Sequence, residues 1–290
     1  MAFRTVMVSS RCKLEYSLNY LVYKNSEIEK LILLDEIKTL VIDSLQVSIT
    51  SSLLFELMNR KIKVIFIDDK HNPEGELVPY QNNFYSYRKI KSQMAISQEL
   101  KNILWNEIVV MKIINQAKNL NYLKKYDSYQ LLVDYSIKVI EDDKTNREGH
   151  AAKVYFNSLF GKDFSRDDEC NINKYLNYGY SIILSAVNRE VKILGYLTEL
   201  GVHHIGESNS FNLSCDLMEP LRPLVDSLII KNEINDDNFK LKFIELLSKK
   251  VKYVGKDIFL DNAIKLYIED LMGYLLSGDK GKIHFIEYEL

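Results

Sequence analysis

Residues that interrupt regular structure are scarce in this chain of 290 residues. It contains 11 glycines and only 4 prolines, which are Pro73, Pro79, Pro220 and Pro223. Long disordered linkers are usually rich in such residues, so the composition argues against them. A hydrophobic fraction of 47% supports a substantial core, and the length accommodates one large domain or two ordinary ones.

Cysteine is also rare. Cys12, Cys170 and Cys215 lie far apart and form neither a CxxC pair nor a zinc-ligand spacing. An odd number of widely separated cysteines is typical of a protein in a reducing compartment. We therefore expect three buried free thiols.

Long apolar segments are missing. Residues 1–5 lack the apolar run of a signal peptide. No stretch reaches the roughly 18 consecutive apolar residues that a membrane-spanning helix needs. These absences predict a cytoplasmic protein with no membrane partner.

An excess of positive charge is missing as well. The net charge is −2, whereas DNA-binding proteins are often basic overall. Charge alone therefore does not predict DNA binding. Any nucleic-acid surface must be a local basic patch, whose charge is offset by acidic residues elsewhere in the chain, or a surface that partner proteins complete.

The spacing of apolar residues changes along the chain. The first 70 residues favour short strands around one helix, and from about residue 86 apolar residues recur at helical spacing. Extended segments are expected at 3–9, 13–23 (a hairpin), 31–34, 39–42, 63–67 and 75–80, and helices at 51–60, 94–118, 129–140, 148–159, 175–200, 220–230, 237–249 and 260–276. We predict an α+β protein with a small β-rich N-terminal domain over residues 1–78 and a larger all-α C-terminal domain over 79–290.

Glu148 is the first candidate for a metal ligand. It lies in the first turn of a predicted helix that Thr145 or Asn146 can cap. Ala151 and Ala152 allow another helix to approach, and a carboxylate in such a seam is costly unless it is paired or binds a metal. The alternative is a solvated glutamate that the helix dipole favours.

His204 is the second candidate. His203 and His204 follow Gly201, which we expect to end the preceding helix in a left-handed conformation. A rigid helix end can aim an imidazole, although adjacent histidines cannot both point the same way. The alternative is a partly buried loop histidine.

Glu219 is the third candidate. Asp216 is expected to cap a helix that begins near Leu217, so Glu219 would project from its first turn, next to Pro220. A capping box on a salt-bridged surface is the alternative. Two carboxylates and an imidazole suit a hard divalent ion and leave positions for water and a phosphate oxygen. The chain has no HExxH, Walker, GxGxxG or GxSxG motif.

Three sequence blocks together resemble one family. They are residues 146–157 (NREGHAAKVYFN), 159–166 (LFGKDFSR) and 211–226 (FNLSCDLMEPLRPLVD). In combination they are similar to the CRISPR-associated spacer-acquisition integrase, the universal first protein of CRISPR adaptation. The length of the chain and the residues of these three blocks resemble the type II-A branch.

The resemblance implies an architecture and partners. It implies an N-terminal β-domain, a helical C-terminal domain and a homodimer built largely through the β-domains. Two such dimers would flank a dimer of a small ferredoxin-fold partner and join prespacer DNA to the leader-proximal CRISPR repeat. In type II-A systems, the effector nuclease and a ring-forming accessory protein also take part.

The resemblance also implies the chemistry. The three metal ligands of the family correspond to Glu148, His204 and Glu219, which would hold Mg²⁺ or Mn²⁺ in a DNA endonuclease/integrase. A prespacer 3′-hydroxyl would then attack a repeat phosphodiester. From their charge and nearness to the motifs, we expect DNA contacts from Arg147, Lys153, Arg166 and Arg222.

Two other functions stay open. One is a metal-dependent nuclease that hydrolyses branched or single-stranded DNA with the same residues and a water nucleophile. The other is a non-catalytic scaffold that captures DNA, in which the three candidate ligands would not converge.

Overall fold

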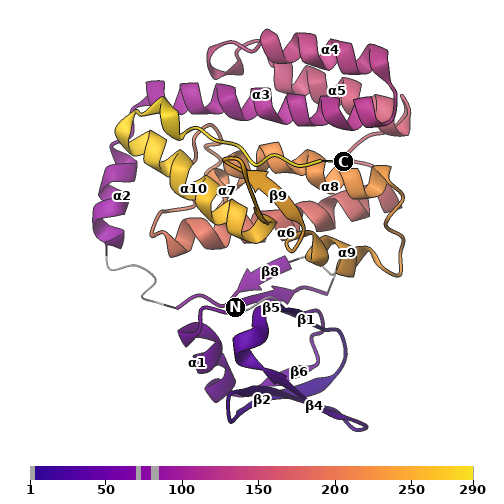
Figure 1. The fold of residues 1–290 in the computed structure, drawn as a ribbon, viewed down its shortest axis with the longest axis vertical. Coiled ribbons are helices and arrows are strands. Elements are labelled where there is room, and N and C mark those ends of the chain that lie inside the picture. Colours follow the sequence, from indigo (N-terminus) through magenta and orange to yellow (C-terminus); the bar gives the residue numbers. More distant parts are fainter. Residues whose placement is uncertain (1–3, 70–72, 80–84, 290) are drawn as a thin grey trace. The chain divides into compact units, whose positions relative to one another are not determined.

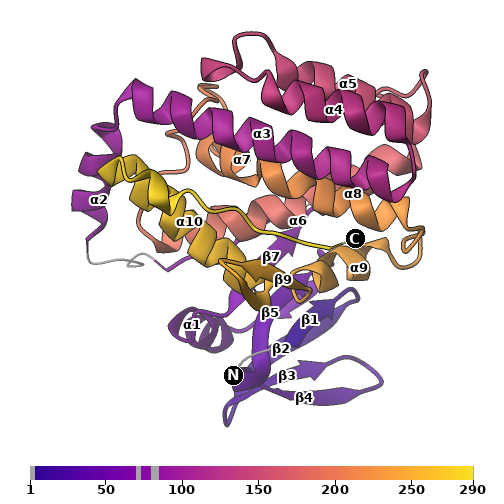
Figure 2. The ribbon, with the colours of Figure 1, turned by 45° about the horizontal axis from the view of Figure 1, so that its top comes forward.

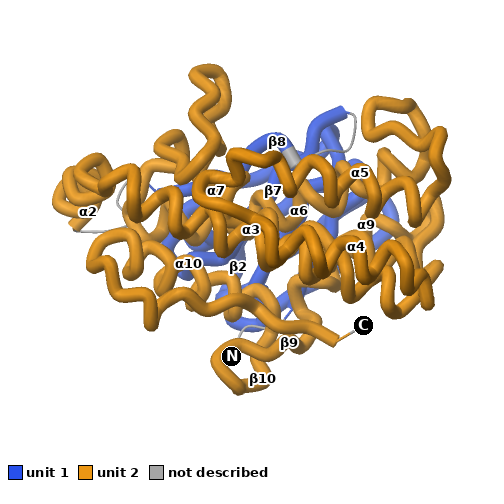
Figure 3. The backbone as a smooth tube through the Cα atoms, turned by 90° about the horizontal axis from the view of Figure 1, so that it is seen from above, with its two compact units in different colours: residues 1–81 blue, residues 82–290 orange. Residues whose placement is uncertain are grey.

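The computed structural model describes residues 4–69, 73–79 and 85–289. It divides into two compact units, Met1–Gln81 and Asn82–Leu290 (Figure 3). The sequence predicts a division after residue 78. Residues 80–84, and with them the predicted extended position of Tyr80, lie outside the described residues.

The first unit is built from short strands and one helix. In its described part these are β1 (Arg4–Val8), β2 (Cys12–Ser17), β3 (Tyr20–Lys24), β4 (Glu29–Leu33), β5 (Ile37–Ile42), β6 (Val47–Ile49), α1 (Ser51–Asn59), β7 (Lys63–Ile67) and β8 (Pro73–Glu76), with a 3-10 turn at Leu34–Glu36. One sheet has the order β1-β5-β7-β8 and the other β4-β3-β2-β6. β1, β5 and β7 run parallel, whereas β2, β3 and β4 form an antiparallel meander.

The first unit has a hydrophobic core of its own. Leu14 and Leu21 from the meander and Leu40 from β5 are fully buried, and α1 adds Leu53 and Leu57. Each such side chain contributes about 1.5–3 kcal/mol by leaving water. The predicted hairpin, helix and buried strands of this unit are confirmed, and β6 is a strand that the sequence pattern did not reveal.

The second unit is mainly helical. Its described elements are α2 (Ser86–Met94), α3 (Gln98–Tyr122), α4 (Tyr126–Ile137), α5 (Arg147–Phe160), α6 (Asn171–Ile193), α7 (Asn212–Met218), α8 (Arg222–Ile230), α9 (Phe239–Leu246), β9 (Lys250–Tyr253), β10 (Lys256–Phe259) and α10 (Leu260–Ser277), with 3-10 turns at Glu141–Asp143, Glu219–Leu221 and Lys280–Lys282. The fold class is therefore α+β, as predicted. The β9–β10 hairpin is an addition to the expected all-α domain.

Helix α3 lies at the centre of the second unit. It passes between the α4–α5 pair and α8 (Figures 1 and 2). Its buried side chains include Trp105 and Ile108, but also Lys112, Asn115 and Asn119. Because buried polar groups need partners, this helix must be surrounded by matching donors and acceptors.

The end of α6 differs from the prediction. The helix ends at Ile193 rather than at residue 200, and Gly195, not Gly201, takes the left-handed conformation, with φ of 85°. Gly201 is needed for a different reason. A Cβ atom there would lie 2.2 Å from the backbone oxygen of His204.

Other expectations also need correction. The helix expected at 220–230 is preceded by α7, so Asp216 lies inside a helix and does not cap one. All three cysteines are free, but Cys170 is exposed and Cys215 only partly buried, so the prediction of buried thiols holds only for Cys12. Among the described residues, no helix is long and apolar enough to cross a membrane.

Gly201→Ala tests the close approach in the histidine loop. Overpacking of this kind typically costs about 1–3 kcal/mol, so we expect a lower free energy of unfolding by chemical denaturation. Gly206→Ala is the matched control, because its Cβ would meet nothing closer than 3.5 Å. Equal effects of the two changes would contradict the packing described here.

Candidate active site

Glu148 is positioned by a tightly capped helix start. Asp143 accepts hydrogen bonds from the backbone nitrogens of Arg147 at 2.8 Å and Glu148 at 2.9 Å. The side chain of Asn146 accepts one from Gly149 N at 3.1 Å, and a Cβ at Gly149 would lie 2.5 Å from that side-chain oxygen. The expected cap at Asn146 is therefore present, with Asp143 as a second one.

The backbone before Glu148 is unusual. Asp142, Asp143 and Asn146 have φ angles of 60°, 44° and 50°. Non-glycine residues in this left-handed region cost of order 1–3 kcal/mol each, and such residues often lie at functional sites. Asp and Asn tolerate the conformation better than most side chains.

Asp216 fixes the histidine loop. This fully buried carboxylate accepts hydrogen bonds from the backbone nitrogens of Val202 at 2.6 Å, His203 at 2.9 Å and His204 at 3.2 Å. It also lies 2.5 Å from His204 Nδ1. Sequence reasoning missed this role, because nothing in the local pattern shows that three amides of another loop meet at Asp216.

The hydrogen bond to Asp216 determines how His204 presents its ring. Since the carboxylate accepts, Nδ1 carries the proton, and in the neutral ring Nε2 is the nitrogen with a lone pair for a ligand. The hydrogen bond to Asp216, together with the charges of Asp216, Glu219 and Glu148, raises the pKa of His204 against the opposing effect of burial. His204 therefore lies in the electrostatic field of both other candidate ligands.

His203 takes a different direction. Its ring stacks on Trp105 with a centroid distance of 4.3 Å and an interplanar angle of 1°. Its Nδ1 lies 3.1 Å from Asp142 Oδ1. The rings of His203 and His204 are nearly perpendicular, at 86°. His203 thus links the histidine loop to the segment before α5, whereas His204 is held by Asp216.

Glu148 and Glu219 meet at a lysine that sequence reasoning also missed. Lys112 Nζ, from the middle of α3, lies 2.5 Å from Glu148 Oε1 and 2.5 Å from Glu219 Oε2. The two carboxylate oxygens are therefore within twice that distance of each other. Glu219 Oε1 also accepts a hydrogen bond of 2.8 Å from Arg222 Nε.

The charges around Glu219 compensate for its burial. Only 4% of Glu219 is exposed. Burial alone would raise its pKa, but the charges of Arg222 and Lys112 outweigh burial and hold this pKa at about 2. Glu219 is consequently ionised, as a metal-binding carboxylate must be.

A polar network lies next to these charges. Asp226 accepts hydrogen bonds from the hydroxyls of Tyr180 at 2.6 Å and Tyr155 at 2.9 Å. Asn119 Nδ2 donates to the Tyr155 hydroxyl oxygen at 2.6 Å. Burial raises the pKa of Asp226 to about 6, despite the two hydroxyl donors. The network joins α3, α5, α6 and α8.

Two of the four expected DNA-contacting cations line the same pocket as Glu219. Arg166 and Arg222 line a pocket of about 210 Å³, which is bounded by Lys112, Gln116, Ala152, Phe156, Arg166, Tyr180, Glu219, Arg222 and Asp226. Arg147 instead lies over the Tyr135 ring at 5.5 Å, and Lys153 is exposed on α5. Neither of them borders this pocket.

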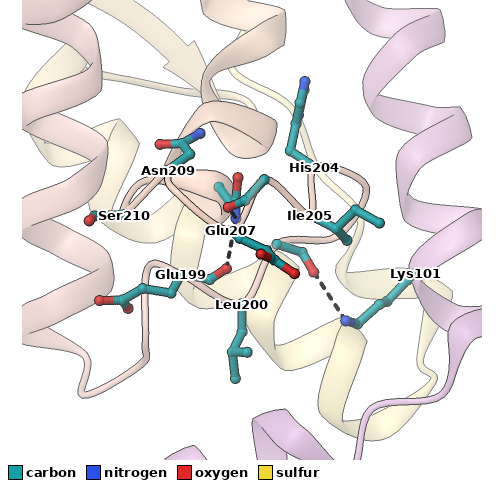
Figure 4. A pocket seen from close by; sticks show the side chains of 11 residues that line it. Lys101, Glu199, Leu200, His204, Ile205, Glu207, Asn209 and Ser210 are labelled. Atoms are coloured by element: carbon teal, nitrogen blue, oxygen red, sulfur yellow. Dashed lines mark hydrogen bonds between the residues drawn. The ribbon is translucent and has the colours of Figure 1, made fainter.

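A second pocket of about 310 Å³ lies beside His204. It is lined by Lys101, Glu199, Leu200, Gly201, His204, Ile205, Gly206, Glu207, Asn209, Ser210 and Asn212. Figure 4 shows His204 and Lys101 on one side and Glu199 and Ser210 on the other. Lys101 Nζ donates a hydrogen bond of 3.0 Å to the Gly201 carbonyl, which ties the histidine loop to α3.

Comparison with known proteins identifies the family. A family model described as CRISPR associated protein Cas1 matches residues 6–250. The chain belongs to the Cas1 family. This confirms the family resemblance, although the match does not distinguish the type II-A branch.

Curated relatives of this Cas1 chain carry endonuclease names. It is 33% identical over 230 residues to the CRISPR-associated endonuclease Cas1 of Neisseria meningitidis serogroup C (strain 8013), a match that covers 79% of this chain and 76% of the relative. It is 29% identical over 291 residues to CRISPR-associated endonuclease Cas1 1 of Francisella tularensis subsp. novicida (strain U112), with coverage of 89% and 90%.

Solved structures share the fold. A Cas1 protein from Thermotoga maritima superimposes with a TM-score of 0.72 at 18% identity, covering 94% of this chain and 97% of that one. A casposase bound to integration product gives 0.76 at 19% identity, with coverage of 97% and 92%. At such identities the similarity establishes the fold and not the reaction.

The donor set suits a divalent ion, although the side chains do not enclose one as placed. Among the described residues, no group of three or more His, Cys, Asp or Glu side chains is arranged to hold a metal. Glu148 and Glu219 nevertheless share one cation, the Lys112 ammonium. An ammonium thus lies between two carboxylate oxygens, and carboxylate oxygen is the ligand type that Mg²⁺ and Mn²⁺ prefer.

The raised pKa of Asp226 predicts a pH dependence of stability. A carboxyl whose folded-state pKa is raised stabilises the fold below its unfolded pKa and loses that contribution as pH rises through the folded value. The free energy of unfolding of the wild type, relative to Asp226→Asn, should therefore fall by about 2 kcal/mol between pH 4 and pH 6. Denaturant titrations of both proteins at several pH values measure this change. A difference in free energy of unfolding that does not vary with pH would exclude a raised pKa of Asp226.

Proposed function

We propose that this Cas1 chain is a metal-dependent DNA integrase of the type II-A branch that inserts prespacer DNA into a CRISPR array. The observation that carries the proposal is the convergence of Glu148 and Glu219 on one cation, in the electrostatic field of His204. These residues come from α5, the loop after α6 and the turn between α7 and α8. Three separate segments thus contribute to one charged site.

In this proposal, Glu148, His204 and Glu219 hold Mg²⁺ or Mn²⁺. The bound ion supplies Lewis-acid chemistry at a phosphodiester oxygen. Asp216 keeps the proton on His204 Nδ1, which leaves Nε2 available as a ligand. Arg222 holds Glu219 in place through a hydrogen bond to Oε1.

The reaction needs no nucleophile from the protein. The 3′-hydroxyl oxygen of the prespacer forms a bond to the phosphorus of the repeat, and the bond from that phosphorus to the repeat's own 3′-oxygen breaks. The hydroxyl proton is released, and the leaving 3′-oxygen gains a proton. Arg166 and Arg222 line the pocket beside Glu219 and are suited to bind backbone phosphates there.

We further propose that the chain acts as a homodimer together with the small ferredoxin-fold adaptation partner. Prespacer and CRISPR repeat DNA are its substrates, and the type II effector nuclease and the ring-forming accessory protein also take part. Support for a Cas partner comes from the names of structural neighbours. One is a Cas6-RT-Cas1–Cas2 complex with a TM-score of 0.75 at 18% identity, in which this chain covers 36% of the longer chain.

Hydrolysis of branched or single-stranded DNA is the second candidate function. The curated relatives are named endonucleases, which favours this activity. It uses the same side chains with water in place of the 3′-hydroxyl. A joined product indicates the integrase and a cleaved one the nuclease. A non-catalytic scaffold is less consistent with two carboxylates that converge on one nitrogen.

Substitution of the candidate ligands tests the site. We expect Glu148→Ala and His204→Ala each to reduce strand transfer of a labelled prespacer at least about 10²-fold. Each change removes a proposed ligand of the metal ion that would bind the scissile phosphate. His150→Ala is the matched control, since His150 is exposed on the same helix as Glu148. Circular dichroism and size-exclusion chromatography should show folded dimers. Full activity in either ligand variant would remove that residue from the site.

Removal of the metal tests the cofactor. Strand transfer should stop in EDTA and return when Mn²⁺ or Mg²⁺ is added in excess over the chelator. An imidazole ligand favours Mn²⁺ over Mg²⁺, so Mn²⁺ should restore activity at the lower concentration. Undiminished joining in chelator would refute the metal mechanism.

A further inference from the structure

Lys112 occupies the position between the two candidate metal ligands. Only 9% of this lysine is exposed, and its ammonium contacts Glu148 and Glu219. Burying an ammonium is costly, so its location requires compensating charge. The two carboxylates supply that charge, and in return the lysine prevents them from repelling each other.

The charge balance makes the lysine and a divalent ion competitors. Lys112 and Arg222 together neutralise Glu148 and Glu219. Like charges a few ångströms apart repel strongly at the effective dielectric constant of a protein, and a divalent ion doubles the repulsion that a monovalent ion would cause. An ammonium and a divalent ion therefore do not share the same carboxylate oxygens without a large loss of free energy.

A position for the displaced ammonium already exists. Gln116 lies one helical turn after Lys112 and therefore on the same face of α3. Its Oε1 atom is buried and has no hydrogen-bond partner. Both side chains line the pocket of about 210 Å³ that also contains Arg166 and Arg222. The four-carbon stem of a lysine lets its nitrogen swing over several ångströms.

We propose that Lys112 is a positioning residue that holds Glu148 and Glu219 together before metal binds and is displaced by the ion toward Gln116. The inference rests on the proposed function, because it takes the two glutamates as metal ligands. In its second position the ammonium stays in the pocket with Arg166 and Arg222 but is no longer neutralised by the two carboxylates. A DNA phosphate there offsets that charge, so metal and DNA strengthen each other's binding.

The test is Mn²⁺ binding to the folded full-length chain, measured by electron paramagnetic resonance at fixed pH and without DNA. Lys112→Met removes the competing charge and keeps the apolar stem. We expect it to bind Mn²⁺ at least tenfold more tightly than the wild type. Its melting temperature should be lower than that of the wild type without the ion, and Mn²⁺ should raise it more. A lysine with a merely structural role would lower the melting temperature equally with and without Mn²⁺.

Two further variants make the test specific. Lys118→Met is the matched control, because Lys118 is on the same helix but contacts Asn115 and Tyr288, and its Mn²⁺ affinity should equal that of the wild type. Gln116→Leu keeps the lysine and both carboxylates but removes the receiving acceptor. We expect it to weaken Mn²⁺ binding severalfold, which is the opposite direction to Lys112→Met.

Addition of a short DNA duplex tests the coupling. The duplex should increase the Mn²⁺ affinity of the wild type more than that of Lys112→Met. Equal or weaker Mn²⁺ binding by folded Lys112→Met would overturn the displacement, and an unchanged affinity in Gln116→Leu would overturn the second position. If the wild type and Lys112→Met both bind no Mn²⁺, even with DNA, the proposed metal site itself fails.

Discussion

The carboxylate of Glu219 is buried inside a helical unit, and much of the surrounding structure compensates for that charge. Lys112 contacts its Oε2 atom and Arg222 its Oε1 atom. Because Lys112 comes from the middle of α3, the register of this helix against α5 and the turn before α8 is fixed by the ion pairs. Asn115 reinforces the same register, since its side-chain amide donates to the carbonyl of Pro220 at 2.8 Å.

Two aspartates solve a second problem, which is to hold candidate ligands that come from loops and helix ends. Asp143 accepts the amide of Glu148, and Asp216 accepts the amide and the ring nitrogen of His204. In each case a buried carboxylate binds backbone donors that would otherwise lack partners. The candidate ligand side chains are thereby directed by neighbouring carboxylates. Such an outer shell commonly sets the orientation and basicity of metal ligands.

The sequence predicted the parts of this structure that depend on local pattern. Period-two alternation located β2 and β3, and helical spacing located α10 almost to the residue. It failed where a pattern continues past a turn: apolar residues run on to Leu200, although the helix already ends at Ile193. The family resemblance pointed to Glu148, His204 and Glu219, but the pattern around them favoured ordinary capped and solvated residues.

Lys112 shows why the rest of the site was not predictable. A lysine in a helix is normally solvated, and only its location four residues after the buried Ile108 hinted otherwise. Its two partners are 36 and 107 residues away along the chain. Asp216 has the same property, since the amides that it binds belong to a loop 12 to 14 residues earlier. Contacts of this kind exist only after the helices have packed.

The net charge of −2 does not by itself predict a nucleic-acid function. The charge that matters for DNA binding is the local charge of the site, and not the net charge of the chain. Lys112, Arg166 and Arg222 border one pocket with Glu219 and Asp226, and a divalent ion that displaced Lys112 toward Gln116, as proposed above, would add its own charge to that site. A phosphate backbone responds to this local field far more than to distant charges, which salt screens beyond about 8 Å. A slightly acidic chain can therefore present a cationic site whose strength depends on metal binding.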